Sequence, residues 1–207
     1  MSLRGKKYWI VGASEGLGRE LVMALSKLGV ELVISARNED RLTELAFITG
    51  AKVLTLDVTN KKAVKLAGES IGPLDGVIYA AGVYTPVNAT AWNANEVEQM
   101  IDINFTGAVR VLAAVVPRFV EFGKGHIVII GSLSGFRGLS GALGYGASKA
   151  GIMHLAENIH ADLYSSGVKV QLINPGFIKT RLTDKNDFKM PFILSLIHIS
   201  EPTRRSA

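Results

Sequence analysis

The sequence predicts a single α/β domain built on a doubly wound parallel sheet. Six short apolar runs alternate with amphipathic stretches, and several runs are nearly continuous β-branched or aliphatic residues, as expected for strands buried on both faces. Glycines mark the ends of the amphipathic stretches, and the connections are short. Repeated strand–helix units joined in this way favour a parallel sheet covered by helices on both faces.

The predicted elements follow this alternation along the chain. The 207 residues suffice for one domain with a sizeable core, and no linker or repeat interrupts the pattern before about residue 193. Strands are expected at residues 7–11, 31–35, 52–56, 76–79, 126–130 and 169–173. Helices are expected at residues 17–28, 39–48, 61–70, 96–122 and 146–164.

Composition narrows the classes of function. The chain is 48% hydrophobic and 20% charged, with a net charge of +5. Its Lys and Arg are scattered rather than clustered among aromatic residues, so the positive charge favours an anionic cofactor over nucleic acid. With no cysteine and with histidines that lack ligand spacing, the sequence predicts no disulfide and no metal site. His126 lies in an apolar strand pattern and is expected to be structural.

The lengths of the apolar runs and the start of the first strand indicate where in the cell the protein is found. No apolar run approaches the ~18 residues needed to cross a bilayer. The first predicted strand begins at about Lys6, which leaves no room for a signal peptide. We therefore expect a soluble cytoplasmic protein that does not enter a membrane.

A glycine-rich turn, residues 11–18 (VGASEGLG), joins the first predicted strand to the first predicted helix. Its glycines allow the backbone to turn sharply and to approach a pyrophosphate at the helix N-terminus. A tight turn that serves only helix packing is the alternative. The residues of this turn predicted to contact a dinucleotide cofactor are Gly12, Ser14, Gly16, Leu17 and Gly18.

The end of the second predicted strand bears on the choice of cofactor. A fold selective for NAD usually places Asp or Glu there to hold the ribose 2′-hydroxyl, and no acid stands at residues 35–37. Arg37 can pair with a 2′-phosphate, so NADP(H) is favoured over NAD(H). Glu15 argues mildly the other way because it is expected near the same phosphate. A plain surface role for Arg37 is the alternative.

Two further stretches follow predicted strands at the same edge of the sheet. Asp57, with Val58 beside it, can accept a hydrogen bond from the adenine amino group; alternatively it caps a turn before Asn60 and the next helix. Ala81 and Gly82 are small, which lets the backbone pass close to the cofactor. Both stretches are therefore predicted to contact the cofactor.

Tyr145 and Lys149 stand four residues apart and share one face of a predicted helix, with Ser132 upstream of them. A nearby ammonium favours phenolate, so Lys149 is expected to lower the pKa of Tyr145 from about 10. Such a pair suits the interconversion of a carbonyl and an alcohol. A Tyr and a Lys at this spacing on a solvated face is the alternative.

The glycine turn, Asp57-Val58, Ala81-Gly82, Asn104, Ser132, Tyr145 and Lys149, taken in this order, resemble the short-chain dehydrogenase/reductase family over about residues 4–193. The resemblance implies a single-domain Rossmann fold that uses NAD(P)(H) to oxidise alcohols or reduce carbonyls. The sequence departs from the family at Val11, where Thr is common, and at Tyr79-Ala80, where Asn-Asn is common.

Roles follow from the resemblance position by position. Tyr145 is implied as the general acid/base, and Ser132 as a hydrogen-bond donor to the substrate oxygen. Lys149 is implied to lower the pKa of Tyr145 and to bind the nicotinamide ribose. Asn104 is implied to hold a water that links Lys149 to solvent.

A Pro-Gly segment after the sixth predicted strand resembles the family segment that lies over the nicotinamide. A plain turn is the alternative interpretation. The residues of this segment predicted to contact the cofactor are Pro175, Gly176, Ile178 and Thr180.

Residues 194–204 (LSLIHISEPTR) resemble a translated sequencing adapter. We therefore interpret residues 1–193 as the catalytic domain, residues 194–207 as a non-native tail, and the last strand of the sheet as missing. A genuine short C-terminal strand or helix is the alternative.

The function predicted from these patterns is an NADP-preferring oxidoreductase that interconverts a secondary alcohol and a ketone or aldehyde. A cofactor-binding sensor or scaffold without activity, or an inactive truncated fragment, are the alternatives. The predicted partner is a small molecule, with an apolar pocket near Tyr84, Trp92, Leu133 and Phe136. The natural protein is expected to form a homodimer or homotetramer through the predicted helices 96–122 and 146–164, although Phe105, Val109, Leu112 and Val116 are equally suited to the core.

Overall fold

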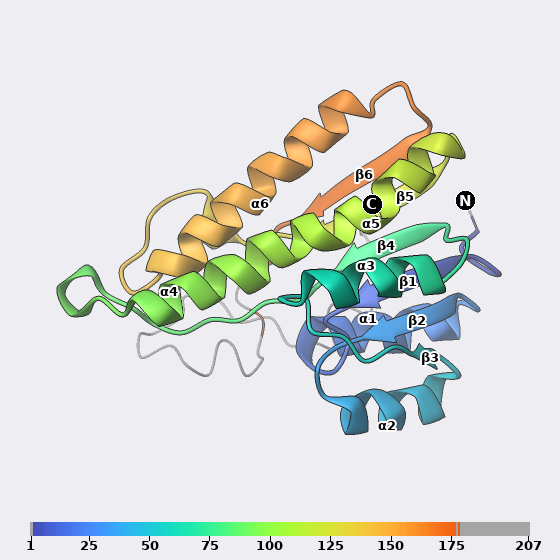
Figure 1. Cartoon of the computed structure of the whole chain (residues 1–207), viewed down its shortest axis with the longest axis horizontal. Coiled ribbons are helices and arrows are strands. Elements are labelled where there is room, and N and C mark those ends of the chain that lie inside the picture. Colours follow the sequence, from blue (N-terminus) through green and yellow to red (C-terminus); the bar gives the residue numbers. More distant parts are fainter. Residues whose placement is uncertain (1, 177, 179–207) are drawn as a thin grey trace, which may run out of the picture.

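The computed structural model describes residues 2–176 and 178 and shows a six-stranded parallel sheet with helices on both faces (Figure 1). The strand order is β3-β2-β1-β4-β5-β6, so the chain starts in the middle and winds outward in both directions. The predicted fold class is confirmed for this part of the chain. Residues 194–207, interpreted as a tail, lie outside the described residues, as does any strand beyond residue 178.

The observed strands match the apolar runs closely. They are β1 Lys7–Val11, β2 Glu31–Ser35, β3 Lys52–Val53, β4 Gly76–Tyr79, β5 Gly125–Ile130 and β6 Val168–Ile173. The third strand is shorter than predicted. Beyond Val53 the regular ladder ends, although the backbone N–H groups of Leu54 and Leu56 still donate to Ile34 and Ala36 of the neighbouring segment.

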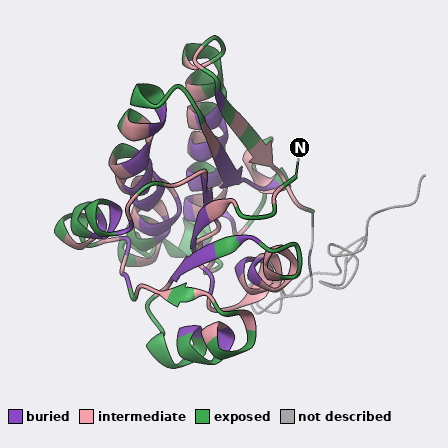
Figure 2. Cartoon of the chain, turned by 90° about the vertical axis from the view of Figure 1, so that its right-hand side faces the viewer, coloured by how far each residue is buried: buried purple, intermediate pink, exposed green. Residues whose placement is uncertain are grey.

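Alternating side chains of the strands enter two separate core layers. Trp9 and Val11 of β1 pack with one cluster, and Tyr8 and Ile10 pack with the other. This double burial is the physical reason why the strands read as continuous apolar runs. Figure 2 shows buried residues on the central strands, between helices whose outer faces are exposed.

Helices α3, α5 and α6 cover one face, and α1 and α2 cover the other (Figure 1). The cap of α2 is Asn38, whose side chain accepts from the backbone N–H of Arg41 at 2.9 Å. The helix bounds are α1 Gly16–Lys27, α2 Glu39–Thr49, α3 Lys61–Ser70, α4 Ala94–Ile101, α5 Gly107–Glu121 and α6 Leu143–Asp162. Two short 3₁₀ turns are η1 Ala89–Ala91 and η3 Leu133–Gly135.

The helix predicted at residues 96–122 is interrupted by a π-helical turn, η2 Asp102–Thr106, between α4 and α5. The Ile103 carbonyl in this turn accepts a hydrogen bond from the buried Tyr79 hydroxyl at 2.5 Å. Tyr79 is one of the positions where the sequence departs from the family pattern, and its hydroxyl fixes this turn. Such turns often mark functional sites, and this one carries Asn104.

The continuous helical segment Ala94–Glu121 is long and apolar enough to cross a membrane by length and composition, the one such segment among the residues described. Its side chains Val111, Val115 and Phe119 are buried against the sheet. Its apolar character is therefore explained by its place in the core of an α/β fold.

His126 is a satisfied structural residue, as predicted. Its Nδ1 lies 2.8 Å from the Tyr8 hydroxyl, and its Nε2 lies 3.2 Å from Oε1 of Gln171. Burial lowers its pKa below the ordinary value, with smaller opposing and supporting effects from Gln171 and Lys169.

Candidate active site

A cleft of about 940 Å³ opens at the carboxyl ends of the strands. Residues from distant parts of the sequence meet there because the strands are parallel and end at one edge of the sheet. The predicted site residues that line it are Gly12, Ser14, Gly16, Leu17, Gly18, Arg37, Asp57, Val58, Ala81, Gly82, Tyr145, Lys149, Pro175, Gly176 and Ile178.

Two predicted site residues, Asn104 and Ser132, are buried and are not among the lining residues. Thr180 lies outside the described residues. The sequence patterns did not assign several further lining residues to the site, among them Asn38, Arg41, Val83, Ile130 and Gly131. Arg41 could have been predicted, because it stands four residues after Arg37 at the start of a helix and so lies near it.

The glycine turn is shaped by close backbone approaches. Gly12 has a φ of 93° and Gly16 has a φ of 57°, both in the region that favours glycine. A Cβ on Gly12 would overlap the backbone N of Ala81, and a Cβ on Gly18 would overlap the carbonyl oxygen of Gly12. The turn is held by the backbone N–H of Gly12, which donates to Ser35 at 2.7 Å.

We expect Gly12→Ala to destabilise the protein by at least about 2 kcal/mol, through the positive φ and the overlap with Ala81. Thermal unfolding measures the change. The matched control is Gly138→Ala, because a Cβ at Gly138 meets no atom within 4 Å. Equal unfolding midpoints for the two variants would refute this account of the turn.

Two arginines and one glutamate meet at the β2–α2 end of the cleft. Arg37, Arg41 and Glu15 all line it. Nη1 of Arg41 lies 2.6 Å from Oε2 of Glu15, and both side chains are about half exposed. Glu15 was expected near the same place as Arg37, and the structure shows that a second arginine pairs with it.

Asp57 has the turn-capping role that the sequence allowed. Its Oδ1 accepts from the backbone N–H of Thr59 at 2.9 Å and from the Thr59 hydroxyl at 2.8 Å, so it shapes the turn before α3. It also lines the cleft. Next to it, the Val58 carbonyl accepts from Arg110 at 3.2 Å, and Arg110 is also paired with Asp102 at 2.8 Å.

Asn104 ties the cleft wall to the helix that carries Tyr145. Its Oδ1 accepts from the backbone N–H of Val83 at 2.8 Å, and its Nδ2 donates to the Val83 carbonyl at 3.0 Å. Nδ2 also donates to the Ser148 hydroxyl at 3.0 Å, which in turn donates to the Tyr145 carbonyl at 2.8 Å. Ser148, which the sequence patterns did not single out, thus fixes the first turns of α6.

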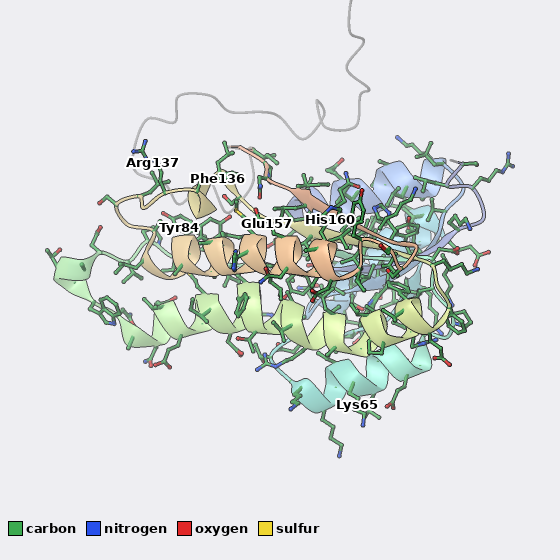
Figure 3. All side chains as sticks on the ribbon, turned by 90° about the horizontal axis from the view of Figure 1, so that it is seen from above. Lys65, Tyr84, Phe136, Arg137, Glu157 and His160 are labelled. Atoms are coloured by element: carbon green, nitrogen blue, oxygen red, sulfur yellow. The ribbon has the colours of Figure 1, made fainter. Side chains whose placement is uncertain are left out.

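Tyr145 is partly buried and lies between an aromatic ring and a serine. Its ring packs edge-on against Tyr84, with centroids 5.1 Å apart, and Figure 3 shows Tyr84 beside the first turns of α6. Burial raises the pKa of the Tyr145 phenol above its ordinary 10.0. A hydrogen bond with Ser132 opposes this rise, and the Tyr84 phenol adds to it.

Lys149 is buried beneath Tyr145. Its Nζ donates to the Ile130 carbonyl at 2.8 Å and lies 5.7 Å from the centroid of the Tyr145 ring. Burial lowers the pKa of Lys149 from 10.5 to about 8. The expected lowering of the Tyr145 pKa by Lys149 is not found, because desolvation dominates the phenol and the ammonium is directed to Ile130.

The predicted apolar pocket is assembled only in part. Tyr84 packs on Tyr145, whereas Trp92, Leu133 and Phe136 are 61%, 54% and 65% exposed. Phe136 and Arg137 lie on the loop above the first turns of α6 (Figure 3). Among the described residues, no group of three or more His, Cys, Asp or Glu side chains is placed to hold a metal ion.

Comparison with known proteins places this cleft in one family. The family model described as short chain dehydrogenase matches residues 6–190. An uncharacterized oxidoreductase of Myxococcus xanthus (strain DK1622) is 40% identical over 194 residues, which cover 89% of this chain and 77% of that protein. An uncharacterized oxidoreductase of Staphylococcus epidermidis is 36% identical over 185 residues, which cover 86% of this chain and 80% of that protein.

Solved structures agree with the sequence relatives. A short-chain dehydrogenase from Sphingobium yanoikuyae in complex with NADPH superimposes with a TM-score of 0.85 at 30% identity, covering 94% of this chain and 81% of that one. The closed form of a serine dehydrogenase complexed with NADP+ gives 0.87 at 27% identity, with 94% and 86% covered. The chain therefore belongs to the short-chain dehydrogenase family of oxidoreductases.

Proposed function

We propose that this oxidoreductase prefers NADP(H) and interconverts a secondary alcohol and a ketone, with Tyr145 as general acid/base. The observation that carries the proposal is that one cleft is lined by the glycine turn, by Tyr145 and by the buried Lys149. A dinucleotide site and a proton donor are thereby brought to the same edge of the sheet. We assign both to a single catalytic domain that comprises residues 1–193.

The glycine turn suits the phosphates of a nicotinamide dinucleotide. Gly12 and Gly18 let the turn pack against neighbouring backbone where a Cβ would overlap, and α1 begins at Gly16, so the helix N-terminus lies at the cleft. When bound, the nicotinamide gives or takes the hydride, and the protein supplies binding, orientation and the proton. The residues that we assign to cofactor contact are Gly12, Ser14, Gly16, Leu17, Gly18, Arg37, Asp57, Val58, Ala81, Gly82, Asn104, Tyr145, Lys149, Pro175, Gly176, Ile178 and Thr180.

The preference for NADP(H) is supported by charge. Arg37 and Arg41 line the β2–α2 end of the cleft, where an acid would be needed to hold an unphosphorylated ribose. Guanidinium groups bind phosphate through charge-assisted hydrogen bonds. Two solved relatives are complexes with NADPH and with NADP+, which agrees with this preference.

The route of the proton follows from the chemistry of the site. In the reducing direction, Tyr145 Oη gives its proton to the substrate carbonyl oxygen, and in the oxidising direction it accepts a proton from the alcohol. The Ser132 hydroxyl, which already hydrogen-bonds Tyr145, donates to the same oxygen as negative charge develops there. We assign Lys149, which is protonated below a pH of about 8, to hydrogen-bond the nicotinamide ribose beside Tyr145.

Asn104 is buried and supports the cleft without lining it. Its side-chain amide is already engaged by Val83 and Ser148. We propose that it holds the cleft wall and the start of α6 in register, and that the water expected to link Lys149 to solvent lies beside it.

The assembly and location of the protein complete the proposal. Leu112 is buried in the core, whereas Val109 is 39% exposed and Val120 and Phe122 are 46% and 54% exposed. These exposed apolar residues of α5 and its C-terminal end favour contact with a second copy of the chain, as a homodimer or homotetramer. We propose that the protein works in the cytoplasm on a small molecule, with no nucleic acid or membrane partner.

The test is turnover of a panel of ketones by the full chain, with NADPH and separately with NADH, followed by the absorbance of the reduced cofactor. Oxidation of NADPH that depends on an added ketone, and that is faster than oxidation of NADH, supports the proposal. Binding of NADPH without turnover of any ketone or alcohol would instead indicate a cofactor-binding protein that is inactive.

A further inference from the structure

A short ion pair lies at the β2–α2 end of the cleft. Oε2 of Glu15 and Nη1 of Arg41 are 2.6 Å apart, and the guanidinium donates a charge-assisted hydrogen bond to the carboxylate. Both residues line the cleft together with Arg37. Glu15 lies in the glycine turn immediately before α1, and Arg41 lies in the first turn of α2, so the pair joins the two walls.

The charges of these three residues decide what the site can bind. At neutral pH, Arg37 and Arg41 each contribute +1 and Glu15 contributes −1, so the group carries +1. Without Arg41 the group is neutral, and the Glu15 carboxylate faces the cleft without that guanidinium. A carboxylate repels a phosphate but accepts hydrogen bonds from the hydroxyls of an unmodified ribose.

We infer that Arg41 determines the preference for a 2′-phosphorylated cofactor by pairing with Glu15 and so removing the repulsion between this carboxylate and the phosphate. Arg41 is thus a positioning residue that acts through Glu15, while Arg37 provides the charge that contacts the phosphate. The inference rests on the proposed function, since it assumes that the cleft binds a nicotinamide dinucleotide.

The local structure holds Arg41 in place for this role. Asn38 caps α2 and accepts from the backbone N–H of Arg41 at 2.9 Å, which fixes where the side chain leaves the helix. Because both members of the pair are about half exposed, solvent screens the interaction, and we expect an effect of moderate size that weakens with added salt.

The test is calorimetric titration of the full chain with 2′,5′-ADP, which carries the 2′-phosphate, and with 5′-AMP, which lacks it. In Arg41→Ala, affinity for 2′,5′-ADP is expected to fall about tenfold, while affinity for 5′-AMP stays within about twofold. In the double variant Arg41→Ala/Glu15→Gln, where the carboxylate is gone, affinity for 2′,5′-ADP is expected to return to within about threefold of the parent.

Arg19→Ala is the matched control. It removes one positive charge from the same part of the chain, but Arg19 pairs with Glu44 at 3.6 Å and Glu20 at 3.8 Å and is not part of the cleft lining. Both affinities should stay within about twofold of the parent in this variant. A fall in 2′,5′-ADP affinity equal to that in Arg41→Ala would show a general charge effect and would overturn the inference.

The other outcomes separate the inference from the proposed function. If the parent chain binds neither nucleotide, the proposed cofactor fails, and the inference fails with it. If the parent binds both equally, the preference for NADP(H) fails. If the parent prefers 2′,5′-ADP and Arg41→Ala shows the same preference, or if Glu15→Gln does not rescue that variant, the role of Arg41 through Glu15 is wrong while the cofactor stands.

Discussion

Tyr145→Phe is expected to lower kcat for ketone reduction about 10³-fold, because the phenylalanine ring has no proton to give to the substrate oxygen. The ring should still pack edge-on against Tyr84, although the hydrogen bond between the phenol and Ser132 is removed. Affinity for NADPH should therefore stay within about threefold of the parent. Steady-state kinetics with a ketone from the panel, combined with calorimetry for NADPH, measures both quantities.

The matched control is Tyr164→Phe, which removes the same hydroxyl from a ring that is 81% exposed beyond the C-terminal end of α6. This variant should turn over like the parent. Substantial turnover by Tyr145→Phe would show that another group supplies the proton. A large drop in NADPH affinity in the same variant would show instead that Tyr145 acts mainly in binding.

Lys149→Met is expected to change activity and stability in opposite directions. Burial of the ammonium holds the pKa of Lys149 at about 8, against 10.5 ordinarily, which corresponds to a destabilisation of about 3 kcal/mol at neutral pH. Methionine removes this cost but leaves the Ile130 carbonyl without its donor, a loss of about 1 kcal/mol. The free energy of unfolding should therefore rise by about 1–3 kcal/mol at neutral pH, while kcat falls about 100-fold.

The pH dependence of the free energy of unfolding shows whether the buried ammonium causes the difference between the parent and Lys149→Met. Below pH 8 the lysine is charged in both the folded and the unfolded state, so the cost of burial is fully present. Between 8 and 10.5 the unfolded chain binds more protons than the folded chain, so the stability of the parent rises with pH and the advantage of Lys149→Met shrinks. Denaturant unfolding at several pH values measures this difference.

Lys65→Met serves as the control for this experiment. The Lys65 side chain is 77% exposed on α3 and extends outward into solvent (Figure 3), and Lys65 does not line the cleft. Its free energy of unfolding should stay within about 0.5 kcal/mol of the parent, with unchanged activity. If Lys149→Met is no more stable than this control at neutral pH, the ammonium is not destabilising where it lies.

Much of the fold could be predicted because the strands of this sheet are buried on both faces. The runs at β1, β2 and β4 coincide with the observed strands residue by residue. The length of strand β3 was overestimated, because an apolar run does not reveal where regular pairing with its neighbour ends. The π-helical turn was also not predicted, since the apolar pattern runs through it without a break; in the structure its Ile103 carbonyl accepts a long-range hydrogen bond from Tyr79.

The sequence predicted the parts of the candidate site that are formed by one contiguous stretch of backbone. It missed the contacts that are formed by side chains from different helices and loops. The glycine turn was readable because its residues are contiguous and its conformation requires glycine. The contacts of Arg41 with Glu15 and of Ser148 with Asn104 cross from one element to another, so their spacing in sequence carries little signal. The sequence led us to expect a lowered pKa for Tyr145, whereas burial raises this pKa in the structure. Sequence alone does not show how strongly a side chain is desolvated.

The most direct test of the central claim is the thermal unfolding of the full chain with NADPH and with NADH at equal concentrations. A ligand that binds only the folded state stabilises it by RT ln(1 + [L]/Kd), or about 2.7 kcal/mol at 100 times Kd. We predict a clear rise in the unfolding midpoint with NADPH and a smaller one with NADH. No rise with either cofactor, or equal rises with both at matched concentrations, would contradict the claim that this cleft is an NADP(H) site.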